Sequence, residues 1–600
     1  MAPVSEIDTQ RQGLNSFISH IQKDTISISE YIYLRILQTG VKSIFGVPGD
    51  FNLDFLEHIY DFNDQLKWIG CCNELNAAYA ADAYAKISKK MGVLVTTYGV
   101  GELSAINGIS GSYAEYAPVL HIVGTSAIKT KNQSEDNFHN IHHLIGAPHT
   151  LQKPDHYIYE KMASHVSVIN ESLNPSSDPC SQIDRAIETV WKKSRPGYIF
   201  LPRDMVELQI PIERLYIPLS LNYEIEKPAL VEKLCDQILN LLYKSENPSI
   251  LADYYTKNFR MESDFLKLVE NCHDKINLYE TFMGKSILTG DEPRFVGTYC
   301  GKLSPNSKIE ESFDESDFIL QIGSCVNEVN YGFYTANIPK EKLVEMNQDY
   351  ISIQGEVYTN VSMMQLLPVL SKRINSNNLK MAKNYPKDLN LIREAELISK
   401  NSKKNLLPLS ENDFHDFLQN FIAKDDILII ETCSFMFSTH DFILHGGKMI
   451  GQFFYNSIGY ATPATLGASI ALKDFNSPGR VITVEGDGSA QMTIQEMASL
   501  MRYGATPTFF ILNNDGYTIE RVIKGPHSSY NDIAPNWNWC QMLKTLGDTD
   551  ESTNSTRIHT KNELNKLLND SSITEGSKLN LVELILDKFD VPSRLANQFS

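Results

Sequence analysis

Two apolar runs in the last third of this 600-residue chain end in acidic and amide side chains. The run from Val481 to Val484 leads into Glu-Gly-Asp487-Gly, and the run from Thr508 to Leu512 leads into Asn-Asn514-Asp-Gly. The stretch between them has a helical pattern, which predicts a βαβ unit whose two strands lie parallel as neighbours. Their carboxyl ends then meet at one edge of the sheet, where open α/β sheets bind ligands.

Asp487 and Asn514 would both offer oxygen at this edge. Oxygen ligands around a turn suit Mg²⁺, whose coordination is usually completed by phosphate oxygens and water. The alternative is that both are ordinary turn residues, since Asp, Asn and Gly favour turns. Their position at the ends of consecutive strands favours the metal site. The intervening helix is expected to line one face with Met492, Met497, Leu500 and Met501.

Glu74 is a candidate acid in a different part of the chain. Small and apolar residues flank it in Cys-Cys-Asn-Glu-Leu-Asn-Ala-Ala, so we expect its carboxylate to be at least partly buried and to need a partner. The alternative is a helix-start carboxylate favoured by the helix dipole.

Gly99 and Gly101 follow a predicted strand, but Ser104 stands where a dinucleotide fingerprint needs its third glycine, which favours a tight turn with close backbone packing.

His142 and His143 are adjacent in Asn-Ile-His-His-Leu. Adjacent residues rarely share one face, so at most one of them is expected to be a direct metal ligand. Imidazole is suited to proton transfer near neutral pH, which is the functional interpretation. The alternative is a loop pair without a role.

Asp50 and Glu520 are two further acids beside predicted turns. Asp50 ends Gly-Val-Pro-Gly-Asp and is either an acid at the end of a strand or a turn or N-cap residue. Glu520 follows Gly516 by four residues, so a helix beginning in this turn would carry it close to whatever the metal site binds. A plain helix-start glutamate is the alternative.

Composition places the chain among globular proteins. Hydrophobic residues make up 42% and aromatic residues 10% of it, and its net charge of −19 argues against a general nucleic-acid-binding protein. Nine scattered cysteines form no C-x-x-C pair, which excludes a disulfide framework or a zinc motif and favours a reducing compartment. The N-terminus resembles neither a signal nor a transit peptide, and no apolar run is long enough to span a membrane. We therefore expect a cytoplasmic protein that binds neither nucleic acid nor membrane.

Strands alternate with helices along most of the chain, which predicts α/β domains with mostly parallel sheets flanked by helices. The length suggests several cores rather than one. Irregular text near 212–227 and an Asn- and Lys-rich stretch at about 375–402 are the expected linkers. The predicted organisation is an N-terminal extension at 1–25, followed by three domains at 26–211, 228–373 and 408–600.

Six motifs together closely resemble the thiamine-diphosphate-dependent 2-oxo acid decarboxylases, above all the fungal pyruvate and phenylpyruvate decarboxylase group. They are Phe45-Gly-Val-Pro-Gly-Asp50-Phe-Asn, Asn73-Glu-Leu-Asn-Ala-Ala-Tyr-Ala-Ala-Asp82, Gly99-Val-Gly-Glu-Leu-Ser-Ala105, His142-His143, Gly486-Asp-Gly488 and Asn513-Asn-Asp-Gly-Tyr-Thr-Ile-Glu520. The resemblance covers about residues 26–592. It implies that the first domain binds the pyrimidine of the cofactor, that the second is the middle domain, and that the third binds the diphosphate with Mg²⁺.

The resemblance also implies roles for individual residues. Asp487, Asn514 and the carbonyl of Gly516 would hold Mg²⁺. Glu74 would hydrogen-bond the pyrimidine ring of thiamine diphosphate. Asp50, His142, His143 and Glu520 would move the protons that lead from a 2-oxo acid to an aldehyde and CO₂. The implied cofactor-binding residues are Glu74, Thr432, Asn456, Ile458, Asp487, Gly488, Ser489, Asn514 and Gly516.

In this family Glu74 and the metal ligands come from different subunits, so the resemblance implies a homodimer or homotetramer with its active site at the dimer interface. The chain departs from the pyruvate pattern at Cys433, where a glycine is usual, and at Tyr455, which replaces a usual tryptophan. A regulatory cysteine of some pyruvate decarboxylases is also missing after Asp253. These changes favour a bulkier acid such as phenylpyruvate, indolepyruvate or a branched-chain 2-oxo acid, whereas Ile519 and Ile523 keep the aliphatic residues of a narrow pocket and favour pyruvate. A catalytically inert thiamine-diphosphate sensor and a carboligase are the other hypotheses.

Overall fold

The computed structural model describes residues 24–62, 65–137, 140–149, 152–386, 408–533, 536–549 and 552–596. Residues 1–23 of the predicted N-terminal extension and most of the second predicted linker therefore lie outside the described residues, whereas a strand begins at Thr25, inside the predicted extension. The chain forms two compact units. Unit 1 contains residues 1–222 with the segments 462–477 and 493–505, and unit 2 contains the remainder.

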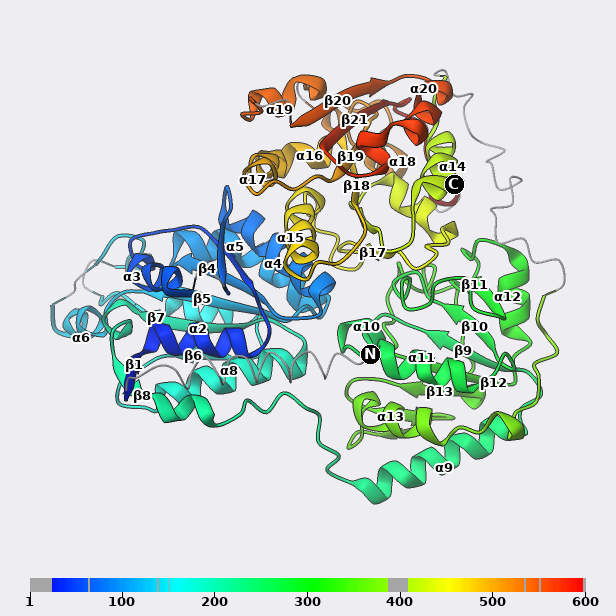
Figure 1. Ribbon diagram of the computed structural model, residues 1–600, viewed down its shortest axis with the longest axis horizontal. Coiled ribbons are helices and arrows are strands. Elements are labelled where there is room, and N and C mark those ends of the chain that lie inside the picture. Colours follow the sequence, from blue (N-terminus) through cyan, green and yellow to red (C-terminus); the bar gives the residue numbers. More distant parts are fainter. Residues whose placement is uncertain are drawn as a thin grey trace. The chain divides into compact units, whose positions relative to one another are not determined.

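Unit 1 is built on a six-stranded parallel sheet in the order β3-β2-β4-β5-β7-β6. Its strands are β2 (Ser43–Gly46), β3 (Lys67–Gly70), β4 (Gly92–Thr97), β5 (Val119–Thr125), β6 (Asn170–Ser172) and β7 (Gly197–Pro202). Helices α4 (Glu74–Ser88) and α5 (Val100–Ala114) cover one face, and α2 (Ile28–Gln38) and α8 (Pro179–Lys193) cover the other (Figure 1). Shorter helices are α3 (Leu53–Glu57), α6 (Ile128–Asn137) and α7 (Ile158–Ala163), and β1 (Thr25–Ser27) pairs antiparallel with β8 (Gln209–Pro211).

Local sequence signals explain where the helices of unit 1 begin. The side chain of Asn73 accepts a hydrogen bond from the backbone N–H of Asn76, so α4 begins at Glu74. Ser27 and Glu30 form a reciprocal capping box at the start of α2. Gly92 starts β4 close to α4, since a Cβ there would lie 2.2 Å from the carbonyl oxygen of Ala81.

Two helices from the C-terminal part of the sequence complete unit 1. They are α15 (Ala461–Asp474), apart from its first residue, and α17 (Met497–Arg502). The side-chain amide of Asn76 donates to Glu496 Oε2 over 2.7 Å, and Lys67 Nζ lies 2.9 Å from Asp474 Oδ1. Gly70 N donates to the hydroxyl of Tyr503 over 2.7 Å. One buried and two partly buried polar contacts therefore tie these segments to α4 and β3.

Unit 2 contains two further sheets. The first has the order β11-β10-β9-β12-β13-β14-β15, and its last two pairings are antiparallel. Its strands are β9 (Pro248–Ala252), β10 (Asn277–Glu280), β11 (Phe295–Thr298), β12 (Phe318–Ile322), β13 (Leu343–Met346), β14 (Ile351–Ile353) and β15 (Glu356–Tyr358). Its helices are α9 (Pro228–Lys244), α10 (Tyr255–Asn258), α11 (Glu262–Asn271), α12 (Ser307–Asp314) and α13 (Met363–Arg373).

The other sheet of unit 2 is parallel throughout, in the order β17-β16-β18-β19-β21-β20. Its strands are β16 (Ile427–Ile430), β17 (Lys448–Ile450), β18 (Val481–Gly486), β19 (Thr508–Asn513), β20 (Thr553–Ile558) and β21 (Leu579–Ile585). The associated helices are α14 (Glu411–Phe421), α16 (Asp487–Thr493), α18 (Thr518–Ile523), α19 (Met542–Thr545), α20 (Lys561–Lys566), α21 (Ser571–Thr574) and α22 (Ser593–Ala596). One buried cluster that includes Phe282, Phe414 and Phe510 connects this sheet with the preceding one.

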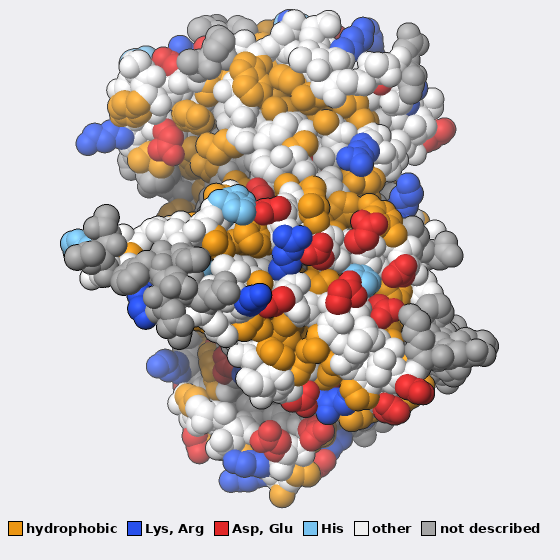
Figure 2. Space-filling model, turned by 90° about the vertical axis from the view of Figure 1, so that its left-hand side faces the viewer, with side chains coloured by type: hydrophobic (Ala, Val, Ile, Leu, Met, Phe, Trp, Pro, Cys, Tyr) orange, Lys and Arg blue, Asp and Glu red, His pale blue; other side chains and the backbone are white. Residues whose placement is uncertain are grey.

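The structure confirms the expected fold class of mostly parallel sheets flanked by helices, with one large sheet inside each predicted domain. The expectation of one continuous helix between β18 and β19 is wrong. A 3₁₀ turn at Ile494–Glu496 separates α16 from α17, so Met492 is 51% exposed whereas Met497 and Leu500 are buried. The described helices include none with the length and apolarity to cross a membrane. On the face shown in Figure 2, acidic, basic and hydrophobic side chains are interspersed.

Candidate active site

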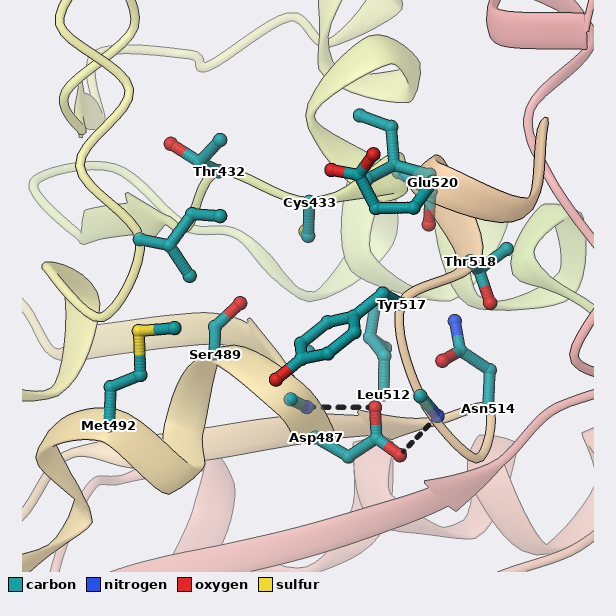
Figure 3. Close-up of a pocket in the computed structure, with 16 residues that line it drawn as sticks. Thr432, Cys433, Asp487, Ser489, Met492, Leu512, Asn514, Tyr517, Thr518 and Glu520 are labelled. Atoms are coloured by element: carbon teal, nitrogen blue, oxygen red, sulfur yellow. Dashed lines mark hydrogen bonds between the residues drawn. The ribbon is translucent and has the colours of Figure 1, made fainter. Parts of the chain in front are cut away.

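A pocket of about 300 Å³ lies at the carboxyl ends of β18 and β19 in unit 2. The pairing of Gly486 with Leu512 confirms that these strands are parallel neighbours. Figure 3 shows Asp487 and Asn514 at one end of the pocket, and Thr432 and Glu520 at the other. The lining residues are Thr432, Cys433, Ser434, Ile458, Gly486, Asp487, Gly488, Ser489, Met492, Leu512, Asn514, Gly516, Tyr517, Thr518, Ile519 and Glu520.

Asp487 is fully buried at the first position of α16. Its Oδ1 accepts a hydrogen bond from Gly488 N over 2.9 Å, and its Oδ2 accepts one from Gly516 N over 3.1 Å (Figure 3). Burial raises the pKa of this carboxyl group to about 7, although both backbone donors favour the ionised form. A cation beside Asp487 would offset the cost of removing its charge from water.

Asn514 has an unsatisfied oxygen in the same place. Its side-chain Oδ1 is buried and accepts no hydrogen bond from the described part of the chain. A buried acceptor without a partner costs about 1–3 kcal/mol, which a metal ion would remove. A buried carboxylate, an unpaired amide oxygen and nearby backbone carbonyls form the all-oxygen donor set that Mg²⁺ prefers, so these residues fit that ion.

The turn after β19 depends on glycine. Gly516 has φ +129°, and a Cβ there would lie 2.3 Å from the carbonyl oxygen of Asn531. Gly488 has an equally close neighbour, because a Cβ would lie 2.5 Å from Cε1 of Tyr517. Both glycines therefore allow the chain to close around Asp487.

The other predicted cofactor-binding residues of unit 2 lie on neighbouring segments. Ser489 and Ile458 line the pocket, and Ile458 is 37% exposed. Thr432 Oγ1 lies 3.4 Å from the side-chain amide of Asn456, whose left-handed backbone has φ 56°. Glu520 lies on α18, which begins in the turn as expected, and lines the same pocket.

Two buried acids beside these segments were not predicted. Glu431 and Glu485 directly precede Thr432 and Gly486 on neighbouring strands, and both are almost fully buried. Glu431 accepts from the backbone N–H groups of Thr432 and Ala461, each over 2.8 Å, and burial raises its pKa to about 7. It thereby ties the end of β16 to the start of α15. The signal that identified Asp487, a polar residue at the end of an apolar run, could also have identified Glu431 and Glu485.

Unit 1 carries a second group of predicted residues. His142 Nε2 lies 2.7 Å from Asp50 Oδ2, and the rings of His142 and His143 are 4.7 Å apart between centroids. One ligand atom each from Asp50, His142 and His143 lies within 4.8 Å of the others. Both adjacent histidines therefore offer a ring nitrogen near Asp50, although neighbouring residues rarely share one face, and the backbone of His143 is left-handed with φ 68°. That at most one of them is a direct metal ligand stays a prediction.

Two tyrosine hydroxyls hold the histidine turn. Tyr98 donates to the carbonyl of His142 over 2.8 Å, and Tyr159 donates to the carbonyl of His143 over 2.5 Å. The hydroxyl of Tyr159 also accepts from Ile145 N over 2.9 Å. At Gly99, with φ +67°, a Cβ would lie 2.4 Å from the His143 carbonyl oxygen. The glycine thus allows the close backbone packing that was expected of it.

Glu74 is the first residue of α4 and is half-buried, so both the helix-start and the buried-acid interpretations describe it. Burial raises the pKa of its carboxyl group. Gly101 leaves room for this carboxylate, since a Cβ there would lie 3.1 Å from Glu74 Oε1. The predicted residues therefore form two groups, one with Glu74 in unit 1 and one with Asp487 in unit 2.

Comparison with known proteins finds similarity to thiamine pyrophosphate enzymes in all three domains. Thiamine pyrophosphate enzyme family models match the N-terminal binding domain at residues 26–149, the central domain at 235–367 and the C-terminal binding domain at 432–579. A transaminated amino acid decarboxylase of Saccharomyces cerevisiae is 35% identical, over 99% of this chain and 98% of its own. Pyruvate decarboxylase isozyme 1 of the same yeast is 34% identical over 96% and 98%, and the pyruvate decarboxylase of Candida glabrata is 34% identical over 96% and 97%. The chain belongs to the thiamine-diphosphate-dependent 2-oxo acid decarboxylases.

Proposed function

We propose that this enzyme converts a bulky 2-oxo acid to an aldehyde and CO₂, with the diphosphate of its cofactor held through Mg²⁺ at Asp487, Asn514 and the carbonyl of Gly516. The observation that carries the metal assignment is the unpaired, buried Oδ1 of Asn514 beside the buried carboxylate of Asp487. Without a cation, both groups would be buried at a free-energy cost.

When bound, thiamine diphosphate supplies the electron sink for loss of CO₂. The chain's own residues handle protons. Glu74, whose pKa is raised by burial, can hold and return a proton to a ring nitrogen. Asp50 and His142 can pass a proton along their 2.7 Å contact, while His143 and Glu520 are the other proposed donors.

We propose that two copies of the chain complete each active site, as the family resemblance implies. Glu74 from one copy would then act on a cofactor anchored by Asp487 of the other. Nine free cysteines fit the reducing cytoplasm proposed for this homodimer.

The substrate proposal depends on the stretch after β16. Cys433 and Ser434 both line the pocket, so the replacement of a usual glycine by Cys433 places a larger side chain at the site. The name of one relative, a transaminated amino acid decarboxylase, indicates that acids derived from amino acids are used within the group. Ile519 also lines the pocket and is the residue that favours a narrower substrate such as pyruvate, so the substrate panel includes that acid.

A substrate panel tests this proposal. Purified protein with thiamine diphosphate and Mg²⁺ is given pyruvate, phenylpyruvate, indolepyruvate and a branched-chain 2-oxo acid, and CO₂ and aldehyde are measured. We expect kcat/KM for a bulky acid to exceed that for pyruvate by at least about tenfold, the scale set by one or two methylene contacts. A preference for pyruvate would refute the substrate class. No turnover of any acid would favour the inert sensor, and condensation products without free aldehyde would favour a carboligase.

Substitution of Glu74 separates catalysis from folding. Glu74→Gln should abolish turnover while thermal unfolding changes little. Glu262→Gln is the matched control, because Glu262 is likewise the first residue of a helix, α11, and lies outside the pocket. Full activity of Glu74→Gln would remove this residue from its proposed role.

Complementation tests the shared site. Glu74→Gln and Asp487→Asn should each be inactive, but co-expression should restore about a quarter of wild-type activity, because half the dimers are mixed and each mixed dimer has one intact site. No recovery, with mixed dimers shown by mass spectrometry, would refute a site built from two copies.

A further inference from the structure

The cluster of Asp50, His142 and His143 has a donor set different from that of the Mg²⁺ site. It offers two imidazole nitrogens and one carboxylate oxygen, with one ligand atom from each residue within 4.8 Å of the others. Imidazole suits borderline cations such as Zn²⁺ and Co²⁺, whereas Mg²⁺ prefers oxygen. Three protein ligands with an open fourth position are typical of accessible zinc sites.

The backbone that carries the two histidines is held in place without any metal. The hydroxyls of Tyr98 and Tyr159 donate to the carbonyls of His142 and His143. The ring of Phe51 lies 4.9 Å from the His142 ring and 5.9 Å from the His143 ring. Because the main chain is already fixed, only side-chain freedom is lost when a cation binds.

The distances require only side-chain adjustments. Ligand atoms around a tetrahedral Zn²⁺ with bonds of about 2.0–2.1 Å are separated by roughly 3.3 Å. The 2.7 Å contact between His142 Nε2 and Asp50 Oδ2 would have to lengthen slightly, and the wider separations in the cluster, which lie within 4.8 Å, would have to shorten. Both side chains can move, because His142 is 61% and Asp50 is 48% exposed.

We propose that Asp50, His142 and His143 form a second cation site, for Zn²⁺ or a cation of similar borderline character. A cation there takes the ring nitrogens and the carboxylate oxygen that would otherwise carry protons. Binding therefore inhibits the enzyme, and this consequence rests on the proposed function whereas the binding does not.

Metal binding is measured first, without turnover. Full-length protein in saturating Mg²⁺ is titrated with Zn²⁺ against a chromogenic chelator, and with Co²⁺ by visible absorption. Wild type should bind one Zn²⁺ at this cluster. Asp50→Asn and His143→Asn should each weaken it at least tenfold, since even the loss of an outer-shell partner costs about 10–100-fold. Tyr159→Phe should weaken Zn²⁺ binding by roughly tenfold, because it removes an outer hydrogen bond that supports the ligand His143.

His58→Asn is the matched control. His58 Nε2 also lies 2.7 Å from a carboxylate, that of Glu207, but His58 belongs to no such cluster within the part of the chain that the structure describes. This variant should keep the wild-type affinity, as should Asn514→Leu at the Mg²⁺ site. Equal Zn²⁺ affinity in wild type, Asp50→Asn and His143→Asn would overturn the proposal, as would a cobalt spectrum dominated by thiolate coordination in wild type.

Inhibition is measured separately. Zn²⁺ should lower kcat over the concentration range in which the chelator assay shows binding, and His58→Asn should be inhibited as wild type is. Binding without inhibition would refute the proton role of the cluster and leave the cation site standing. Inhibition without cluster-dependent binding would overturn the cation site.

Discussion

Adjacent asparagines at the end of β19 should respond in opposite directions to the same substitution. Asn513 and Asn514 are buried to the same degree, at 5% and 6% exposure. Asn513 Nδ2 donates to Glu583 Oε1 over 2.7 Å, whereas Asn514 Oδ1 accepts nothing from the described residues. Leucine has nearly the shape of asparagine but no polar atoms.

In the absence of cofactor, Asn514→Leu removes a buried, unsatisfied oxygen. The free energy of unfolding should rise by up to about 1–3 kcal/mol, the cost of leaving such a group unpaired. Asn513→Leu instead breaks a hydrogen bond to a charged group and leaves Glu583 with one partner fewer. We expect it to lower the free energy of unfolding by about 1.5–3 kcal/mol.

Thiamine diphosphate with Mg²⁺ should reverse this order. A ligand at 100 times its Kd stabilises the folded chain by about 2.7 kcal/mol. Wild type and Asn513→Leu should gain this stabilisation, and Asn514→Leu should lose most of it. Urea unfolding of all three proteins with and without cofactor provides the measurement. An Asn514→Leu protein that is less stable than wild type without cofactor, yet keeps the full response to it, would refute the metal assignment.

Three further substitutions test unit 1. Burial raises the pKa of Glu102 from about 4.5 to about 8, so the folded chain retains a proton that the unfolded chain releases. The free energy of unfolding should therefore fall as pH rises through this window. Glu102→Gln should make the midpoint of urea unfolding depend less on pH between about pH 5 and pH 8. Gly101→Ala would place a Cβ 3.1 Å from Glu74 Oε1 and should lower kcat while the circular dichroism spectrum stays unchanged. Tyr159→Phe removes the hydrogen bond to the His143 carbonyl. It should lower kcat by on the order of tenfold at constant KM, which is part of the ~10²–10⁴-fold rate increase that a positioned proton-transfer group supplies. An unchanged kcat would show that the hydroxyl only stabilises the turn.

The meeting of Asp487 and Asn514 at one edge of the sheet could be predicted from the chain's periodicity. Apolar runs ending in Asp487 and Asn514 give parallel strands, and parallel strands bring their carboxyl ends together. The helix between them could not be predicted in the same way. Its pattern assumes one continuous period of 3.6 residues, whereas the 3₁₀ turn at Ile494–Glu496 resets that period and sends Met492 into the pocket.

The histidine cluster shows a different limit of the sequence. Residue types identify Asp50 and the two histidines, but their proximity in the fold, with a positive φ at His143, is not visible in the sequence. The hydroxyls of Tyr98 and Tyr159 that support this conformation act on main-chain carbonyls 44 and 16 residues away. Neither tyrosine lies in a spacing pattern, so only the folded chain reveals them.

Exposure separates the two groups of site residues and bears on how the enzyme assembles. Asp487 is fully buried within unit 2, whereas the side chains of Asp50 and His142 are 48% and 61% exposed. Proton transfer to a reacting substrate is most selective where bulk water is excluded, because water competes for every proton. If Asp50 and His142 transfer protons as proposed, we therefore expect both side chains to be covered in the assembled enzyme. A homodimer that brings a second copy against this surface would supply that cover, and slower ring-proton exchange of His142 with dimerisation would be its direct signature.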